Sequence, residues 1–270
     1  MEESKTKLLN VTDLSSYLYC PRKFYLQKVK GLRDQPNKAM IKGLIRHKIL
    51  EEFSNNEQSL IDSFGSVDKK EIIQRFGKLL DLLIKKVFSK NYPMIEKFNI
   101  SRKELYKKVV EAMQNEILLR AGSVDDAIKK GFIGKDIWEN LEPKYITEMP
   151  LYSEKLGLKG RADRVMISPG MVIPFELKTR ATDKVWDSDE VQVTAYAMML
   201  EEKYPVKIPV GILEAGDIKH EIQIDEEKKR KVLDLIEEVN FLLKNGKPKY
   251  PSSFSKCRTC NFEEQCDELG

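Results

Sequence analysis

The first half of the chain repeats hydrophobic residues every three or four positions, which is the spacing of an amphipathic helix. A helical segment is expected near residues 14–29, with a break at Cys20 because Pro21 is tolerated only in the first turn of a helix. A second helix is expected over 39–53, and it carries His47 among apolar residues. The same spacing predicts further helices over 68–89, 101–120, 124–130, 188–200 and 226–244.

From Lys144 onward the spacing changes to the alternation that is typical of strands. Pro169-Gly170 predicts a tight turn between two of these strands. Pro174 interrupts the second strand of the pair, which predicts a sheet edge or a bulge. A later hairpin is expected around Ala215-Gly216-Asp217. The expected strands are 146–152, 158–167, 171–178, 206–214 and 218–224.

These elements predict an α/β protein with four regions along the chain. The helices between residues 54 and 146 carry no obvious chemistry, so we interpret them as a packed helical lobe, with a separate binding domain as the alternative. The expected regions are N-terminal helices at 1–53, a helical insert at 54–146, a core of strands and helices at 147–246, and a cysteine-containing tail at 247–270.

Composition narrows the class of protein. Hydrophobic residues make up 41% of the chain and charged residues 33%, which supplies a sizeable core and excludes a disordered protein. We find no apolar run of about 18 residues and no apolar stretch typical of a signal peptide, so we expect a cytoplasmic protein without a membrane partner. The formal net charge of +4 is too small to indicate nucleic-acid binding by itself.

The cysteines are arranged as a metal-binding set would be. Cys257, Cys260 and Cys266 follow a C-x2-C-x5-C spacing near the C-terminus, and Cys20 lies near the start. In a reducing compartment this pattern favours metal ligation over disulfides. Zinc and an iron–sulfur cluster both accept four thiolates, so both stay open. Four unrelated thiols, or a zinc knuckle of the tail alone without Cys20, are the further alternatives.

Two carboxylates are expected to face each other across the Pro169-Gly170 hairpin. In a symmetric two-residue turn, Asp163 and Glu176 lie directly opposite, and Lys178 falls on the same face of its strand. A cation such as Mg²⁺ or Mn²⁺ would relieve their repulsion, and such an ion assists phosphodiester hydrolysis. The alternative is an ordinary cross-strand ion pair with Arg161 or Lys178.

These residues resemble a known family. The chain matches the PD-(D/E)xK nuclease signature in its RecB-type form at Gly160-Arg161-Ala162-Asp163 and Glu176-Leu177-Lys178. Each motif is short, but five of them in the same order resemble the CRISPR-associated RecB-like exonuclease family over roughly residues 8–53 and 144–266. The other matching features are the start Leu14-Ser15-Ser16-Tyr17-Leu18-Tyr19-Cys20-Pro21-Arg22, the helix motifs Gly43-x-x-x-His47 and Gln192-x-x-x-Tyr196, and the four cysteines.

The resemblance implies a restriction-endonuclease-like PD-(D/E)xK core, in which a central mixed sheet is flanked by helices, with a helical insert and a C-terminal iron–sulfur tail. It implies that His47, Asp163 and Glu176 ligate Mn²⁺ or Mg²⁺ together with the Leu177 carbonyl. It assigns Lys178 as the catalytic lysine.

The resemblance also implies a cofactor, a substrate and partners. The residues Cys20, Cys257, Cys260 and Cys266 would hold a [4Fe–4S] cluster that ties the tail to the first helix. The expected activity is exonuclease cleavage of single-stranded DNA ends, alongside the CRISPR adaptation integrase proteins. A RecB-type nuclease of recombination or repair outside CRISPR would have the same site, and a non-catalytic DNA-binding subunit is the third hypothesis.

Further residues are candidates for DNA contact or for support of the active site. Gln192 and Tyr196 lie four positions apart, so they share a helix face that can contact DNA or support Lys178. Arg22 and Tyr25 combine basic and aromatic character, which suits phosphate contact and base stacking, or else an ordinary solvated helix face. Glu148 is an additional candidate, because RecB-like patterns place an acid before the Gly-x-x-Asp strand.

Overall fold

The structure is a computed structural model that describes residues 8–178, 183–215, 218–246, 248, 254–258 and 260–269. The chain divides into two compact units. Unit 1 comprises the described parts of 1–35, 149–163 and 170–270, and unit 2 comprises 36–148 and 164–169. The long helix with the Gly43-x-x-x-His47 motif therefore groups with the helical insert.

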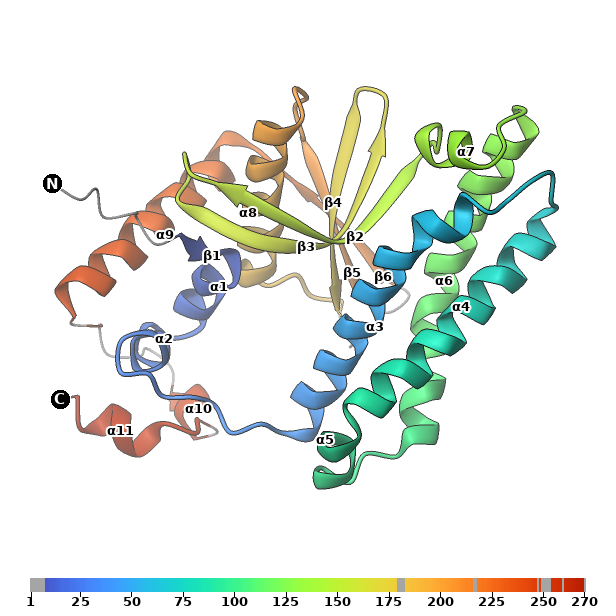
Figure 1. Ribbon diagram of the computed structural model, residues 1–270. Helices are drawn as coiled ribbons and strands as arrows, with labels where there is room; N and C mark the ends of the chain where they lie inside the picture. Colours follow the sequence, from blue (N-terminus) through green and yellow to red (C-terminus); the bar gives the residue numbers. More distant parts are fainter. Residues whose placement is uncertain are drawn as a thin grey trace, which may run out of the picture. The chain divides into compact units, whose positions relative to one another are not determined.

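The strands form one mixed sheet, as the expected fold class requires (Figure 1). Its order is β1-β3-β4-β5-β6, and β2 pairs with β3 outside this path. The β1–β3 and β4–β5 pairs are parallel, whereas β5–β6 is antiparallel. The strands are β1 (Leu9–Asn10), β2 (Lys144–Ser153), β3 (Leu158–Ser168), β4 (Met171–Lys178), β5 (Val210–Ala215) and β6 (Ile218–Gln223).

The hairpin formed by β3 and β4 is confirmed, with Gly170 in its turn at a φ of +71° that favours glycine. At Pro174 the prediction of an edge strand is wrong, because β4 lies between β3 and β5, whereas the alternative of a nearby bulge stays a prediction. The register with β5 runs from Phe175 to Lys178, so the proline precedes this paired stretch. The second predicted hairpin is confirmed by β5 and β6, but Gly216 and Asp217 of its turn lie outside the described residues.

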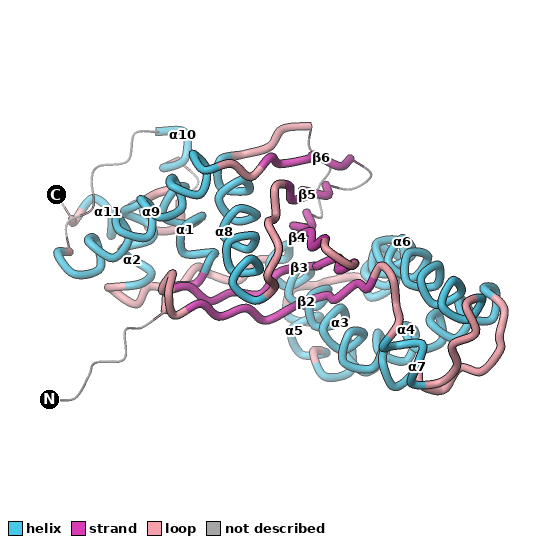
Figure 2. The backbone as a smooth tube through the Cα atoms, turned by 90° about the horizontal axis from the view of Figure 1, so that it is seen from above, coloured by secondary structure: helices cyan, strands magenta, loops and turns pink. Residues whose placement is uncertain are grey.

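Helices of unit 1 cover the sheet. Helix α8 packs on β4 and β5, and α1 and α9 pack against α8 (Figure 2). The predicted break at Cys20 is confirmed: this residue is extended and caps α2, in which Pro21 occupies the first turn. The helices are α1 (Val11–Tyr19), α2 (Pro21–Lys28), α8 (Asp187–Lys203), α9 (Glu226–Asn245), α10 (Phe254–Cys257) and α11 (Glu263–Asp267).

Unit 2 is helical apart from the strand ends that it includes. Its core contains three phenylalanine rings, with Phe76 lying 5.8 Å from Phe53 and 6.1 Å from Phe64 between ring centroids. The break that we expected between 120 and 124 is wrong, because buried residues continue the apolar stripe through Gly122 and offset its weak helix propensity. The helices are α3 (Lys38–Ile61), α4 (Lys69–Lys90), α5 (Tyr92–Lys97), α6 (Arg102–Lys129) and α7 (Lys135–Glu139).

An ion network lies inside unit 2. Arg120 donates two hydrogen bonds to the Glu57 carboxylate, at 2.8 and 2.7 Å, and a third to the Tyr145 carbonyl at 2.8 Å. Glu116 contacts both Arg120 and Arg164. The side chains of these four charged residues are at most 5% exposed, so each charge depends on its partners rather than on water.

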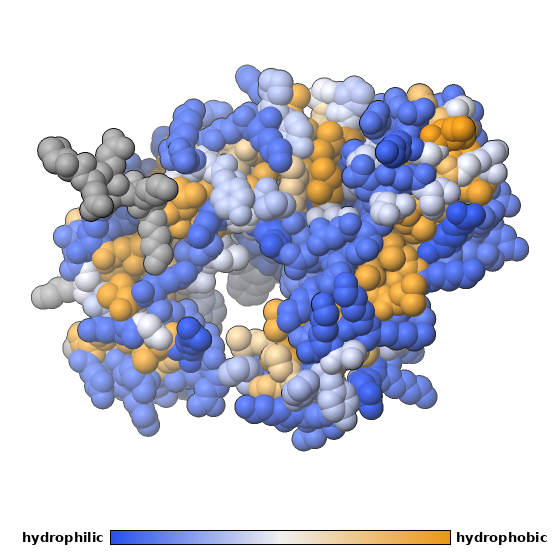
Figure 3. Space-filling model, in the orientation of Figure 1, coloured by the Kyte–Doolittle hydropathy of each residue, from blue (hydrophilic) through white to orange (hydrophobic). Residues whose placement is uncertain are grey.

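The exposed surface in the view of Figure 3 is mostly polar, with scattered apolar groups. Among the helices in the described ranges, none combines the length and the apolar character that crossing a bilayer requires.

Candidate active site and cysteine pocket

The carboxylates predicted from the hairpin meet in unit 1. Asp163 lies on β3 and Glu176 on β4, and their exposed fractions are 8% and 5%. The backbone N–H of Leu177 donates to Asp163 Oδ2 at 2.8 Å, which fixes the Asp163 side chain against the end of β4. Buried carboxylates on adjacent strands are costly without a compensating positive charge.

The electrostatics of this pair fit a divalent metal. Burial, followed by the negative charge of Asp163, raises the pKa of Glu176 to about 8, although Lys178 opposes the rise. A doubly charged cation would favour the ionised form of both groups, and carboxylate oxygens are the ligands that Mg²⁺ and Mn²⁺ prefer. The donor set therefore fits the metal that the sequence predicts.

Lys178 is held between two acids. Its Nζ lies 2.9 Å from Glu176 Oε1 and 3.1 Å from Asp189 Oδ1. Burial lowers the pKa of Lys178, but the two neighbouring carboxylates outweigh that effect and leave the pKa raised. The lysine is therefore a fixed positive charge beside the acid pair.

Asp189 is a site residue that the sequence reasoning missed. It is 6% exposed in the first turn of α8, and besides pairing with Lys178 it accepts a hydrogen bond from the Trp186 backbone N–H at 3.3 Å. The signal was its spacing: Asp189 precedes Gln192 by three positions and Tyr196 by seven, so all three share one helix face.

The predicted Gln192-x-x-x-Tyr196 motif faces the acid pair. Gln192 Nε2 donates to Glu176 Oε2 at 2.6 Å. Tyr196 is 2% exposed, and its pKa is raised by burial and then by the charges of Glu176 and Asp163. A Cβ on Gly160 would lie 2.8 Å from Tyr196 Cε1, which explains the glycine in the Gly-x-x-Asp motif.

His47 belongs to unit 2, where α3 brings it beside β2. Its Nδ1 lies 2.7 Å from Glu148 Oε1. Glu148 is buried and has a φ of +51°, an unfavourable conformation for a residue with a side chain. The pair connects two candidates that the sequence named separately, and the role of His47 as a metal ligand stays a prediction.

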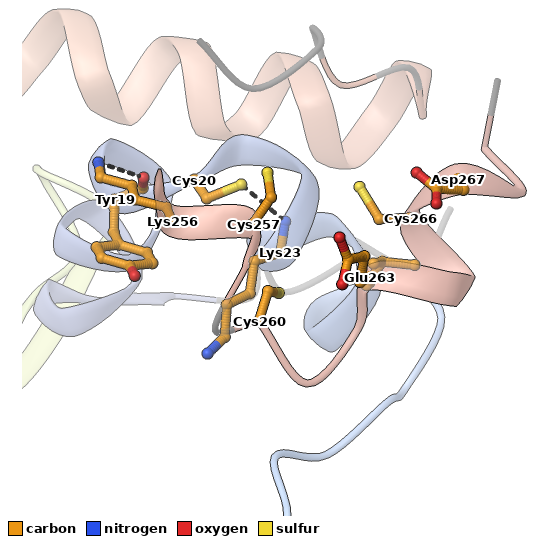
Figure 4. A pocket seen from close by; sticks show the side chains of 10 residues that line it. Tyr19, Cys20, Lys23, Lys256, Cys257, Cys260, Glu263, Cys266 and Asp267 are labelled. Atoms are coloured by element: carbon orange, nitrogen blue, oxygen red, sulfur yellow. Dashed lines mark hydrogen bonds between the residues drawn. The ribbon is translucent and has the colours of Figure 1, made fainter. Parts of the chain in front are cut away.

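The four cysteines come together in unit 1. They line one pocket of about 120 Å³ between α2 and the C-terminal helices, and none of the four is in a disulfide (Figure 4). The pKa of Cys257 is raised by loss of hydration and then by the charges of Cys20, Cys266 and Cys260. Because clustered thiolates repel one another unless a cation binds them, this donor set fits a metal centre.

Arg22 and Tyr25 do not present the surface that DNA contact requires. They are only 4% and 7% exposed. Arg22 Nη1 donates to the Cys266 carbonyl at 3.0 Å and lies 3.9 Å from its sulfur. The structure therefore corrects this expectation for Arg22, which attaches the C-terminal cysteine segment to α2.

Comparison of the sequence with known protein families identifies one that matches. A model of the PD-(D/E)XK nuclease superfamily matches residues 8–267, nearly the whole sequence. The chain therefore belongs to the PD-(D/E)XK nuclease superfamily.

Within that superfamily, its relatives confirm the resemblance to CRISPR-associated RecB-like exonucleases. The "CRISPR-associated exonuclease Cas4/endonuclease Cas1 fusion" of Leptospira interrogans is 32% identical over 149 residues, which cover 50% of this chain and 28% of that protein. The "CRISPR-associated exonuclease Cas4" of Aeropyrum pernix is 29% identical over 126 residues, 44% of this chain and 63% of that protein. The chain thus spans less than two thirds of either relative.

A solved structure titled "Crystal structure of SSO0001" covers 85% of this chain and 99% of its own, at 18% identity and a TM-score of 0.34. At that score the likeness carries no argument about this chain.

Proposed function

We propose that the chain is a divalent-metal-dependent DNA exonuclease that acts on single-stranded ends. The observation that supports this most directly is the buried pair Asp163 and Glu176, with Lys178 and Gln192 bonded to the same glutamate. A buried acid pair beside a fixed lysine suits the hydrolysis of a phosphodiester, since both the substrate and the attacking water must be oriented near positive charge.

The residues have separate roles in this proposal. Asp163, Glu176 and the Leu177 carbonyl hold Mn²⁺ or Mg²⁺, and His47 stays an expected ligand on the resemblance alone. When bound, the metal supplies Lewis-acid chemistry at a phosphate oxygen. Lys178 orients the attacking water or a phosphate oxygen.

Two neighbours support Lys178 and Glu176 in these roles. Asp189 fixes the lysine from the opposite side, at 3.1 Å. Gln192 fixes the carboxylate of Glu176, at 2.6 Å. Neither residue need contact the substrate, since each acts by holding a catalytic side chain in place.

The cysteine pocket is proposed to hold a [4Fe–4S] cluster with a structural role. The four thiols come from α2's N-cap and from the tail, so a shared metal centre joins segments that are more than 200 residues apart in sequence. Zinc is the alternative, and the visible spectrum together with iron and sulfide analysis distinguishes the two.

The printed names of the relatives suggest the context. The relative from Leptospira interrogans is a fusion of Cas4 with the Cas1 endonuclease, and we propose that this chain acts alongside an integrase of that kind during CRISPR adaptation. Copurification of the full chain with such a protein is the direct check, and its absence would favour a repair nuclease with the same site.

The test of the activity uses end-labelled single-stranded DNA with Mn²⁺. Glu176→Ala is expected to abolish cleavage while the fold and the metal content of the cysteine pocket stay unchanged. Glu221→Ala is the matched control, because this glutamate is exposed on β6. Full cleavage by Glu176→Ala, or DNA binding by the wild type without any metal-dependent turnover, would contradict the proposal.

A further inference from the structure

We propose that unit 2 carries a second contact for single-stranded DNA at one end of its helices. This surface, which we call the basic tip, consists of Lys90, Tyr92, Arg102, Lys103 and Lys107, from the end of α4, the start of α5 and the start of α6. The choice of DNA as the occupant rests on the proposed function, whereas the surface itself rests on charge and exposure.

The charge is concentrated at this end of unit 2. Residues 78–108 include nine Lys or Arg and only three Asp or Glu, an excess of six positive charges. The whole chain has a net charge of +4, so this segment carries more than the excess of the entire protein. Lys90 and Lys107 have side chains that are 65% and 79% exposed, which leaves them accessible to a polyanion.

Aromatic rings lie among these charges. Tyr92 is 45% exposed and Tyr106 is 39% exposed. The guanidinium of Arg102 lies over the Tyr92 ring, 5.3 Å from its centroid. Unpaired bases stack on aromatic rings and on guanidinium planes, whereas the bases of a duplex are already stacked. The combination therefore favours a single strand over duplex DNA or an acidic protein.

The basic tip adjoins the helix that carries His47. Lys48 on α3 donates to Asn91 Oδ1 at 2.8 Å, and Asn91 directly precedes Tyr92. Leu44, one turn before Lys48, is 41% exposed. Figure 1 shows α5 beside the first half of α3, and Figure 3 shows apolar groups at the surface there. Single-stranded DNA that is bound at the His47 helix can thus continue onto the basic tip within unit 2.

Fluorescence anisotropy of the full chain with labelled single-stranded DNA, in EDTA to prevent cleavage, tests this inference. Changing Lys90, Lys103 and Lys107 together to Gln is expected to weaken binding at least tenfold at about 0.1 M salt, and to reduce the salt slope by about 2. The matched control changes Lys129, Lys130 and Lys135 to Gln, which removes the same charge from exposed positions elsewhere in unit 2. We expect it to stay within twofold of the wild type.

The aromatic part of the surface has its own test. Tyr92→Ala is expected to weaken single-strand binding about fivefold or more, and Tyr92→Phe should retain it because the ring remains. Equal affinities of the triple lysine variant and its control for single-stranded DNA would overturn the inference. A variant that loses duplex binding as strongly as single-strand binding would also overturn it. Wild-type protein that cleaves DNA while both tip variants bind normally refutes only the basic tip. Wild-type protein that does not cleave refutes the proposed function instead.

Discussion

The buried ion network of unit 2 allows a quantitative prediction about stability. Arg120 and Glu57 are each 2% exposed at their side chains, and Arg120 makes three hydrogen bonds of 2.8 Å or less. Arg120→Met keeps a side chain of comparable length but leaves Glu57 without its partner. Breaking a buried pair in this way costs about 3–5 kcal/mol of unfolding free energy at neutral pH.

The loss should depend on pH. Burial raises the pKa of Glu57 and the charge of Arg120 opposes that rise, so removing Arg120 raises the pKa further. A carboxyl group whose folded pKa exceeds its unfolded value of about 4.3 binds more protons in the folded state. Stability is then lost as pH rises from the unfolded toward the folded pKa. The deficit of Arg120→Met should therefore be smallest near pH 4 and grow toward pH 7.

Urea unfolding of both proteins at several pH values measures this deficit. Lys107→Met is the control, because the Lys107–Glu111 pair is exposed and its loss should cost at most about 0.5 kcal/mol. A deficit for Arg120→Met below about 1 kcal/mol at pH 7, or one that does not change with pH, would refute the reasoning.

Three further predictions concern the site. Gly160→Ala should lower stability by about 1–3 kcal/mol in thermal unfolding and reduce cleavage, because the new methyl group collides with Tyr196; an unchanged Tm would contradict this. Asp189→Asn should lower kcat about 10- to 100-fold through misplacement of Lys178, with the Mn²⁺ concentration for half-activity unchanged; a shift in that concentration alone would contradict it. Arg22→Leu should speed metal loss from the cysteine pocket to a chelator, and equal rates would count against its bracing role.

Much of the fold was predictable because its signals are local. Alternating strands, the Pro169-Gly170 turn and the proline after Cys20 each impose a backbone geometry with few alternatives. The hairpin then places Asp163 opposite Glu176, because the position of a two-residue turn determines which residues of the two strands face each other. The acid pair was accessible from the sequence for this reason.

What the sequence did not reveal depends on tertiary contacts. Besides Glu176, Lys178 contacts Asp189 on α8, and residues 179–182 of the connection between β4 and α8 lie outside the described ranges. Arg22 has the composition of a DNA-binding residue, and only its burial against Cys266 shows otherwise. Proline lacks the N–H that a strand inside a sheet donates, so Pro174 predicted an edge strand. The sequence does not show that the pairing of β4 with β5 begins only at Phe175.

The most direct measurement of the central claim is an anomalous difference map from crystals of the full chain soaked in Mn²⁺. We expect one strong peak within ligand distance of Asp163 and Glu176, close to the Leu177 carbonyl, and no peak there in crystals of Glu176→Ala. A wild-type map with no manganese at these carboxylates, from crystals of protein that cleaves DNA in solution, would contradict the account.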